Sequence, residues 1–268
     1  MARDPLGRPP AVLLVPAVLA TGFLLVPLVS LVVRTPWSDL PAYLTDPAVA
    51  GALWISLVTA VLAMTVCTVL GLPLAWLLAR IDFPGKGLLR ALVTVPLVLP
   101  PVVAGVALLS AFGRTGTLGA PLRELFGLSL PYTTTAVVMA HVFVALPFFV
   151  IAVEGALRSS SSGYDAAAAS LGATRWTTFR RITVPLALPG IAAGVVLGFA
   201  RSLGEFGATI TFAGNYPGVT QTMPTLIYQE LQADQEAARV LSLVMLILSI
   251  TVLAGLREHW LGPAVGRT

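Results

Sequence analysis

The stretch LWISLVTAVLAMTVCTVLGLPLAWLLA, residues 53–79, contains no charged side chain and ends at Arg80. A helix needs about 20 apolar residues to cross the hydrocarbon layer of a membrane, so this stretch is long enough to span it. A helix also satisfies its own backbone hydrogen bonds, which a lipid environment requires. The stretch therefore predicts a transmembrane helix in a protein whose main solvent is lipid.

Further apolar runs of the same kind are separated by short polar segments. Together they predict six spans, at residues 11–33, 53–79, 88–112, 134–157, 188–212 and 240–256. Of the 268 residues, 57% are hydrophobic and only 10% are charged, and the mean hydropathy is +0.91. A soluble domain carries roughly 25% charged residues. We therefore predict an all-α, polytopic membrane protein with a single transmembrane domain over residues 1–268.

The first run follows Arg3 and Arg8, as the apolar part of a signal peptide would. Residues 18–20 also resemble a cleavage site. The run is much longer than the 7–15 apolar residues of a typical signal peptide. We therefore expect a retained span. Only about a dozen residues follow Leu256, so we expect no sizeable regulatory domain on this chain.

The distribution of Lys and Arg between the spans predicts the orientation, because cytoplasmic loops carry the excess of these residues. One side holds Arg3, Arg8, Arg80, Lys86, Arg90, Arg158, Arg175, Arg180, Arg181, Arg257 and Arg267. The other side holds Arg34, Arg114, Arg123 and Arg239. The richer side is predicted to be cytoplasmic, with both termini on it, which agrees with an even number of spans. The same pattern accounts for the net charge of +4 without nucleic acid.

The sequence gives no sign of a catalytic or metal centre. His141 and His259 are far apart in the sequence, and Cys67 is the only cysteine. The chain also lacks GxxxxGK[ST], the loop whose backbone amides hold nucleotide phosphates. We therefore expect a protein that is not an enzyme by itself and that carries no cofactor.

The longest predicted cytoplasmic connection, residues 158–186, reads RSSSSGYDAAAASLGATRWTTFRRITVPL. Its alanines favour a helix over residues 164–171, and Gly172 suits a left-handed helix end. A second helix, over residues 173–182, would stop before Pro185. Two short helices joined at a glycine can form a knob that fits a groove in a cytoplasmic partner. They can equally form an amphipathic connector on the membrane surface, held by Trp176 and Phe179.

This loop resembles the cytoplasmic signature of ABC-importer permeases. In that signature an acidic residue and two alanines precede a glycine, and an isoleucine ten residues later precedes a hydrophobic residue and a proline. The matching positions here are Ala167, Ala168, Gly172, Ile182, Val184 and Pro185. The acidic position falls on Ala166, and Asp165 stands one residue earlier. Because of this departure, the sequence does not decide whether this chain makes the ion pair that the glutamate makes in the family.

The resemblance implies that this cytoplasmic loop, residues 158–186, docks into an ATP-binding subunit and transmits its closure to the spans. That subunit, rather than this chain, would bind ATP and Mg. The residues expected to couple the two subunits are Asp165, Ala166, Ala167, Ala168, Gly172, Ile182 and Pro185. The implied fold is that of a type I ABC importer permease, which switches between inward-open and outward-open states.

Two features predict irregular structure at membrane depth. Pro96, Pro100 and Pro101 remove backbone donors, either in a simple kink or where a break lines a cavity. Arg201 and Glu205 lie four residues apart, on one helical face. Ionisable groups in a span should face protein or water, so we favour a structural ion pair to a neighbouring helix over a gate. Our candidates for a pathway or gate are Pro100, Pro101, Arg201, Glu205, Thr209 and Asn215.

The segment after the fifth predicted span is too polar to continue a helix across lipid. We expect an external or re-entrant loop there. An ordinary external loop is the simpler interpretation of this segment. Its hydroxyl and amide groups can alternatively receive an oxyanion. These groups belong to Asn215, Thr220, Gln221 and Thr222.

Two stretches look like the molybdate branch of these permeases, which is close to the sulfate/thiosulfate branch. They are ARSLGEFGATITFAGNYPGVTQTMP, residues 200–224, and LVLPPVVAGVALLSAFGRTGTLG, residues 97–119. This resemblance implies a homodimer of permeases, two ATP-binding subunits and a periplasmic or lipid-anchored oxyanion-binding protein. We expect molybdate and tungstate as substrates, with sulfate as the alternative. An ion-coupled secondary transporter is a weaker alternative, because Glu205 alone supports it and no inverted repeat is evident.

Overall fold

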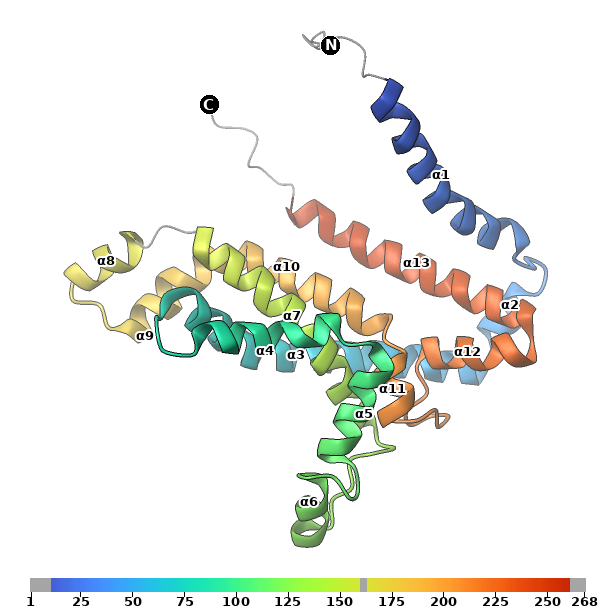
Figure 1. Ribbon diagram of the computed structural model, residues 1–268. Helices are drawn as coiled ribbons and strands as arrows, with labels where there is room; N and C mark the ends of the chain where they lie inside the picture. Colours follow the sequence, from blue (N-terminus) through green and yellow to red (C-terminus); the bar gives the residue numbers. More distant parts are fainter. Residues whose placement is uncertain (1–10, 160–162, 261–268) are drawn as a thin grey trace.

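The computed structural model describes residues 11–159 and 163–260, which form helices and loops without a β-strand (Figure 1). The long apolar helices are α1 (Ala11–Arg34), α3 (Pro47–Arg80), α7 (Thr134–Ser159), α10 (Val184–Leu203) and α13 (Gln235–Trp260). The shorter ones are α2 (Leu40–Leu44), α4 (Lys86–Val98), α5 (Pro101–Phe112), α6 (Gly119–Phe126), α8 (Gly163–Ser170), α9 (Arg175–Thr178), the π-helical turn η1 (Phe179–Thr183), α11 (Gly207–Phe212) and α12 (Met223–Ala233).

Within the described residues, five helical segments are long and apolar enough to cross a membrane. A sixth is obtained if α4 and α5, which meet at an angle of 119°, are counted as one broken span. The all-α polytopic fold predicted from the sequence is confirmed. The helical segment Arg175–Leu203 joins α9, η1 and α10 without interruption.

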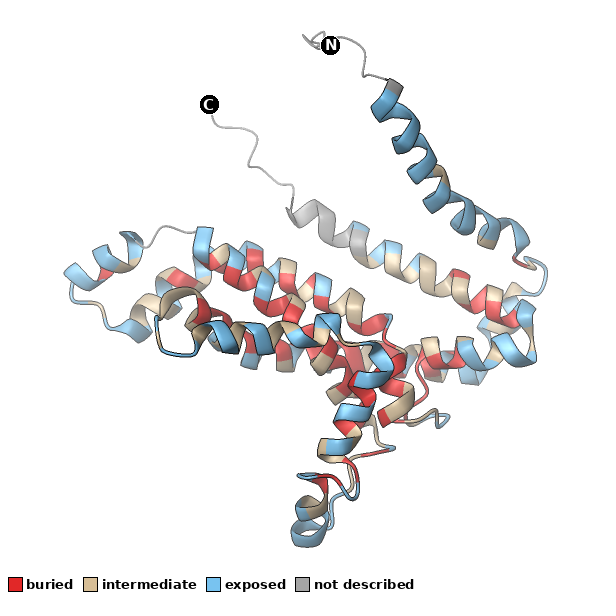
Figure 2. Cartoon of the chain, viewed as in Figure 1, coloured by how far each residue is buried: buried red, intermediate tan, exposed pale blue. Residues whose placement is uncertain are grey.

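The core lies where α7 packs between α3 and α10, and Figure 2 shows buried residues on the facing sides of these helices. Phe149 of α7 is fully buried at the centre. A Cβ added to Gly71 of α3 would lie 2.7 Å from its ring, and one added to Gly194 of α10 would lie 2.9 Å from it. The two glycines therefore make room for one aromatic ring. By contrast, α1 exposes most of its leucine and valine side chains, as lipid or another apolar surface allows.

Two of the spans predicted from the sequence are interrupted in the structure. The first break falls at Leu99 and Pro100, between α4 and α5, as the prolines predicted. The second falls at residues 204–206, between α10 and α11, where the sequence predicted a continuous span over residues 188–212. The break arises because the Glu205 side chain accepts a hydrogen bond from the backbone N–H of Ala208, 2.8 Å away, and so starts a new helix. The apolar pattern of the sequence does not reveal this contact.

The predicted helix end before Pro185 is wrong. The chain passes from η1 into α10 without a break, and Pro185 lies in the first turn of α10. In the π-helical turn the backbone N–H of Val184 bonds to the carbonyl of Phe179, one residue further back than in an α-helix. This wider turn accommodates a proline whose missing donor would break an ordinary α-helix.

Candidate functional site

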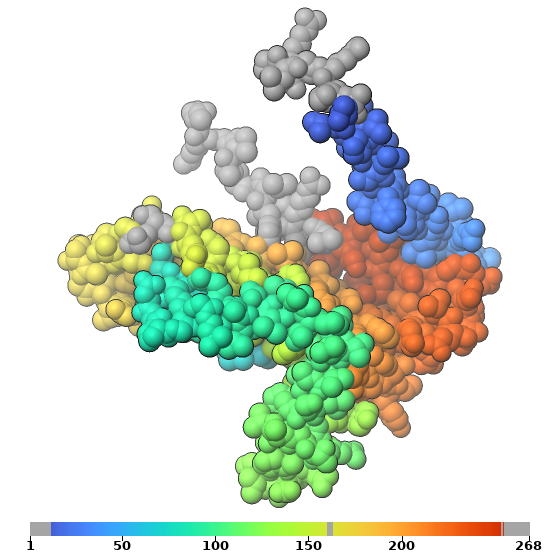
Figure 3. Space-filling view, viewed as in Figure 1, coloured from blue at the N-terminus to red at the C-terminus, as the bar shows by residue number. Residues whose placement is uncertain are grey.

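A tight turn joins α8 to α9 (Figure 1), and the space-filling view shows this yellow part of the chain at one end of the molecule (Figure 3). Gly172 adopts a φ of +80°, the left-handed conformation predicted from the sequence. Its N–H donates to the carbonyl of Ala169, and the N–H of Ala173 donates to the carbonyl of Ala168, both at 3.0 Å. These two bonds form a Schellman motif. Thr174 then caps α9 by accepting the N–H of Thr177 at 3.2 Å, so hydrogen bonds define both sides of the turn.

We call α8, α9 and the turn between them the coupling knob. Its outer surface combines small and large apolar groups: Ala166 and Ala167 are exposed, and Leu171 is 88% exposed. Tyr164 and Trp176 are exposed as well. Exposure of such an apolar surface to water is unfavourable. The knob therefore has the character of a docking surface.

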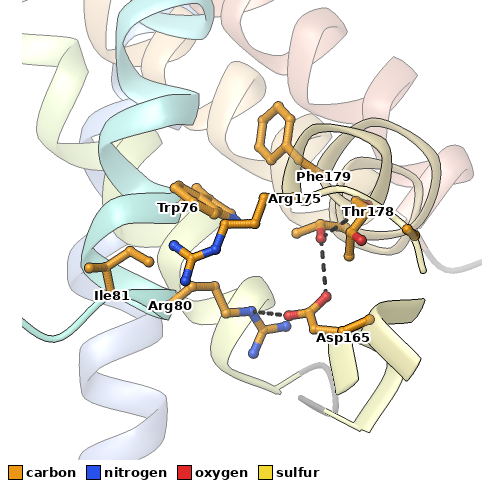
Figure 4. A pocket seen from close by; sticks show the side chains of 10 residues that line it. Trp76, Arg80, Ile81, Asp165, Arg175, Thr178 and Phe179 are labelled. Atoms are coloured by element: carbon orange, nitrogen blue, oxygen red, sulfur yellow. Dashed lines mark hydrogen bonds and ion pairs between the residues drawn. The ribbon is translucent and has the colours of Figure 1, made fainter. Parts of the chain in front are cut away.

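The side of α8 that faces the spans carries Asp165 (Figure 4). Its Oδ2 lies 3.2 Å from Nε of Arg80, the last residue of α3, and its Oδ1 accepts a hydrogen bond from Oγ1 of Thr183 at 3.3 Å. These groups border a cavity of about 340 Å³, also lined by Trp76 and Phe179. The rings of Trp76 and Phe179 meet edge to face, with centroids 5.8 Å apart, and this contact ties η1 to α3.

The remaining residues of the predicted coupling set lie on the helix that leads into the membrane. Ile182 is half-buried in η1, and Pro185 is exposed at the start of α10. The sequence analysis missed Trp76 and Thr183 and used Arg80 only to orient the chain. A possible signal was the position of Arg80, a charge at the end of a long apolar run.

A second charged cluster lies at the same end of the bundle and was also missed. Glu154 of α7 is buried, and its Oε1 accepts hydrogen bonds from Arg90 Nη2 at 2.6 Å and Nε at 3.1 Å. Arg158 Nε lies 3.1 Å from the same oxygen. Arg90 also donates to the carbonyl of Leu78 at 3.4 Å. The cluster therefore holds the start of α4 against α7 and α3.

The two interrupted helical segments meet where α5 packs against α11. A Cβ added to Gly207 would lie 2.5 Å from the Cβ of Pro101, and one added to Gly105 would lie 2.6 Å from the Cβ of Thr211. Side chains larger than hydrogen do not fit at either glycine. We call this close contact the α5–α11 junction. It brings Pro100 and Pro101 beside the helix that follows Glu205.

Arg201 and Glu205 form an ion pair across the break between α10 and α11. Arg201 Nη2 lies 2.7 Å from Glu205 Oε2, while Glu205 Oε1 accepts the N–H of Ala208. Glu205 is buried, whereas the Arg201 side chain is 30% exposed. The described contacts of Glu205 therefore tie the end of α10 to the start of α11, where the sequence analysis expected a tie to a neighbouring helix.

The polar groups of the loop after α11 mostly bond to one another. Asn215 Nδ2 and Gln221 Nε2 both donate to Gln229 Oε1 at 3.0 Å. Thr220 Oγ1 accepts the N–H of Tyr216 at 2.8 Å, and Thr222 caps α12. These bonds make the loop a folded part of the protein and leave few of its groups free for an oxyanion. Thr209 lies apart from them, buried on α11.

Outside the spans, Asp234 links α12, α13 and α2. It accepts the backbone N–H groups of Ala237 at 3.2 Å and Glu236 at 2.8 Å, and the hydroxyl of Tyr43 at 3.0 Å. These bonds lower the pKa of the Asp234 carboxyl below its ordinary value, and the bond from the Ala237 amide has the largest effect. The contact with Asp234 also raises the pKa of Tyr43.

Within the described residues, no group of three or more His, Cys, Asp or Glu side chains is placed to hold a metal ion.

Residues 71–267 match the family described as the inner membrane component of binding-protein-dependent transport systems. The molybdenum transport system permease protein ModB of Mycobacterium tuberculosis is 46% identical over 240 residues, covering 90% of each chain. The sulfate transport system permease protein CysT of Escherichia coli K12 is 38% identical over 234 residues, covering 86% of this chain and 84% of the other. Among solved structures, a bacterial ABC transporter that imports the polysaccharide alginate gives a TM-score of 0.75 at 17% identity, covering 93% of each chain.

Proposed function

This chain belongs to the family of inner membrane components of binding-protein-dependent transport systems, and we propose that it forms the path of an oxyanion in an ATP-driven importer. It is a multi-pass inner-membrane protein and a transport component with the fold of ABC importer permeases. The proposal therefore concerns what passes through it, what drives it and which residues take part.

The coupling knob is the observation that carries the proposed drive. It is a pair of short helices with an exposed apolar surface, and η1 connects it directly to α10. A force on such a knob passes to a membrane-spanning helix without a flexible joint. We propose that an ATP-binding subunit receives the knob through the exposed surface of residues 166–172, that Asp165 holds this surface to the spans, and that Ile182 and Pro185 carry the motion into α10. The chain itself lacks a phosphate-binding GxxxxGK[ST] loop, so ATP and Mg would bind to the partner subunit.

The proposed assembly contains a second copy of this chain, two ATP-binding subunits and an external oxyanion-binding protein. The predicted orientation places the coupling knob in the cytoplasm together with both termini. Residues 1–10 and 261–268 lie outside the described part of the chain, so support for the orientation comes from the basic residues between the spans. Arg80, Lys86, Arg90, Arg158 and Arg175 all lie at the end that carries the knob.

The proposed substrate is molybdate, together with tungstate, which has the same charge and shape. Support comes from the 46% identity to a molybdenum permease, against 38% to a sulfate permease. Sulfate remains the alternative, because it too is a tetrahedral dianion. Within the membrane, the partly exposed guanidinium of Arg201 can attract such an anion, while Glu205 stays buried behind it. We propose that the α5–α11 junction and Arg201 border the path.

Uptake of labelled molybdate and sulfate into proteoliposomes tests the proposal. The vesicles contain the assembled complex, with ATP on the side of the ATP-binding subunit and binding protein on the other. The proposal predicts molybdate uptake that requires ATP and resists excess sulfate. Preference for sulfate would overturn the substrate. Uptake that follows an ion gradient without the ATP-binding subunit would overturn the importer in favour of a secondary transporter.

A further inference from the structure

The one charged side chain of α8 points inward rather than toward a partner. The helix reads GYDAAAAS, so Asp165 is its only ionisable acid besides the weakly acidic Tyr164. Its carboxylate is only partly exposed, at 32%, and the Arg80 side chain is 14% exposed. The neighbouring Ala166 and Ala167, which are exposed, offer a partner no charge. The shift of the acidic residue from position 166 to 165 thus coincides with an ion pair inside this chain.

Each oxygen of Asp165 contacts a different element. Oδ2 meets Arg80 at the end of α3, and Oδ1 meets Thr183 in η1, the turn that becomes α10. One carboxylate therefore joins the coupling knob to the ends of two spans (Figure 4). A hydrogen-bonded carboxylate with two partners fixes the direction of a helix better than either contact alone.

The second half of the knob is held in another way. Phe179 packs edge to face on Trp76 and stacks on Trp176 with centroids 5.7 Å apart, so aromatic contacts hold α9 and η1 to α3. In the described contacts, α8 packs mainly on α9 and η1, its neighbours along the chain. Loss of the Asp165 carboxylate should therefore release α8 while α9 stays in place.

We propose that Asp165 is a positioning residue that latches α8 to α3 and α10, so that the knob and both spans move as one body. The inference rests on the proposed function, because it assumes that an ATP-binding subunit pushes the knob. With the latch, closure of that subunit moves α3 and α10 together. Without it, α8 follows the subunit while the spans lag, and ATP is hydrolysed with less transport.

The first test replaces Asp165→Ala, a residue that suits this alanine-rich helix and so preserves it. The complex is reconstituted with the ATP-binding subunit and binding protein, and molybdate uptake and ATP hydrolysis are measured on the same vesicles. We expect the subunit to co-purify and to hydrolyse ATP near the wild-type rate, while uptake per ATP falls about threefold, as the loss of a partly exposed ion pair suggests. The control is Asp82→Asn, which removes the exposed pair with Lys86 at the same end of the bundle; it should leave uptake per ATP unchanged.

A charge swap, Arg80→Asp with Asp165→Arg, should recover part of the lost uptake per ATP. Unchanged uptake per ATP in Asp165→Ala would overturn the latch. So would loss of co-purification, since Asp165 would then be a docking residue. A failure of the proposed function is distinguishable from both, because the wild-type complex itself would then fail to assemble or would transport without ATP.

A covalent link gives an independent test. Arg80→Cys and Asp165→Cys are introduced together with Cys67→Ser, which removes the buried free thiol. Before cross-linking, this variant should show the low uptake per ATP of Asp165→Ala. A short thiol-reactive cross-linker should restore it, because the link replaces the latch. If the cross-linked complex hydrolyses ATP but its transport stays low or stops, then α8 and α3 must move apart during the cycle and the proposal is wrong.

Discussion

The coupling knob and the α5–α11 junction are held together by different kinds of contact. The knob is exposed and is held to the spans by one partly exposed carboxylate and a set of aromatic contacts. The junction is held by close packing at glycines that leave no room for a side chain. Polar contacts at a water-facing surface break and re-form at little cost in free energy. Closely packed backbones, by contrast, cannot move apart without losing their van der Waals contacts.

We propose that motion arises at the knob and is transmitted through the junction. The knob meets water, where exchanging contacts with a partner costs little. The junction keeps two broken spans together, so that α5 and α11 respond as a unit to any movement of α10.

Filling the junction should be the most damaging change. In Gly207→Val the added carbons collide with Pro101, and overpacking of this kind costs about 1–3 kcal/mol or more. We expect a lower yield of folded protein and a lower midpoint in thermal unfolding in detergent. Gly204→Ala is the matched control, because its Cβ would meet only the carbonyl of Ala200, at 3.8 Å. Equal stability of the two variants would show that the junction is loose.

Neutralising Glu205 should have the next largest effect. Glu205→Gln keeps an oxygen for the N–H of Ala208 but leaves Arg201 without its counter-charge. Loss of one partner from a hydrogen-bonded charged pair costs about 1–3 kcal/mol. We expect lower thermal stability together with reduced uptake. Arg201→Gln combined with Glu205→Gln should recover stability but not uptake if Arg201 attracts the anion, and a double variant with normal uptake would remove Arg201 from the path.

Straining the knob should affect assembly more than folding. Gly172→Val places a branched side chain at a φ of +80°, which costs roughly 1–2 kcal/mol. The strain falls on the α8–α9 turn, so the spans should stay folded while the ATP-binding subunit co-purifies in a smaller amount. Gly155→Ala adds a methyl group in open space on α7 and serves as the control. Normal co-purification of Gly172→Val would argue against docking through this turn.

The contact between Asp234 and Tyr43, at the end opposite the knob, should have the smallest effect. The pKa of Asp234 is lower in the folded protein, so its stabilisation is complete above the ordinary carboxyl pKa of about 4 and is lost as the pH falls through the lowered value. The thermal midpoint of Asp234→Asn should therefore lie below that of the wild type at pH 7, and the gap should narrow below pH 4. A gap that widens in acid would contradict this sign.

Much of the fold was readable from the sequence, because apolar runs in lipid leave the backbone few alternatives to a helix. The break at Pro100 and the left-handed turn at Gly172 were readable too, since proline and glycine restrict the backbone locally. The break after Gly204 was not, because it depends on the side chain of Glu205 reaching the N–H of Ala208. Pro185 also led to a wrong prediction of a helix end, because the π-helical turn before it lets the helix continue.

The candidate site was only partly predictable for a related reason. The coupling set from Asp165 to Pro185 came from a resemblance carried by local spacing. Arg80 lies far from Asp165 in the sequence, and Arg90 lies far from Glu154, so no local pattern reveals these two pairs. Only the pair of Glu154 with Arg158 has the four-residue spacing of a helix. Asn215 appeared free in the sequence, yet folding commits it to Gln229. Pairing between distant residues requires the three-dimensional structure.

The central claim is that the coupling knob lies in the cytoplasm and is covered by an ATP-binding subunit. A single thiol introduced by Leu171→Cys in a Cys67→Ser background tests it most directly, since Leu171 is the most exposed large apolar residue of the knob. An impermeant thiol reagent should label this position only from the cytoplasmic side, and the bound ATP-binding subunit should protect it. Labelling from the outside, or equal labelling with and without the subunit, would contradict the account.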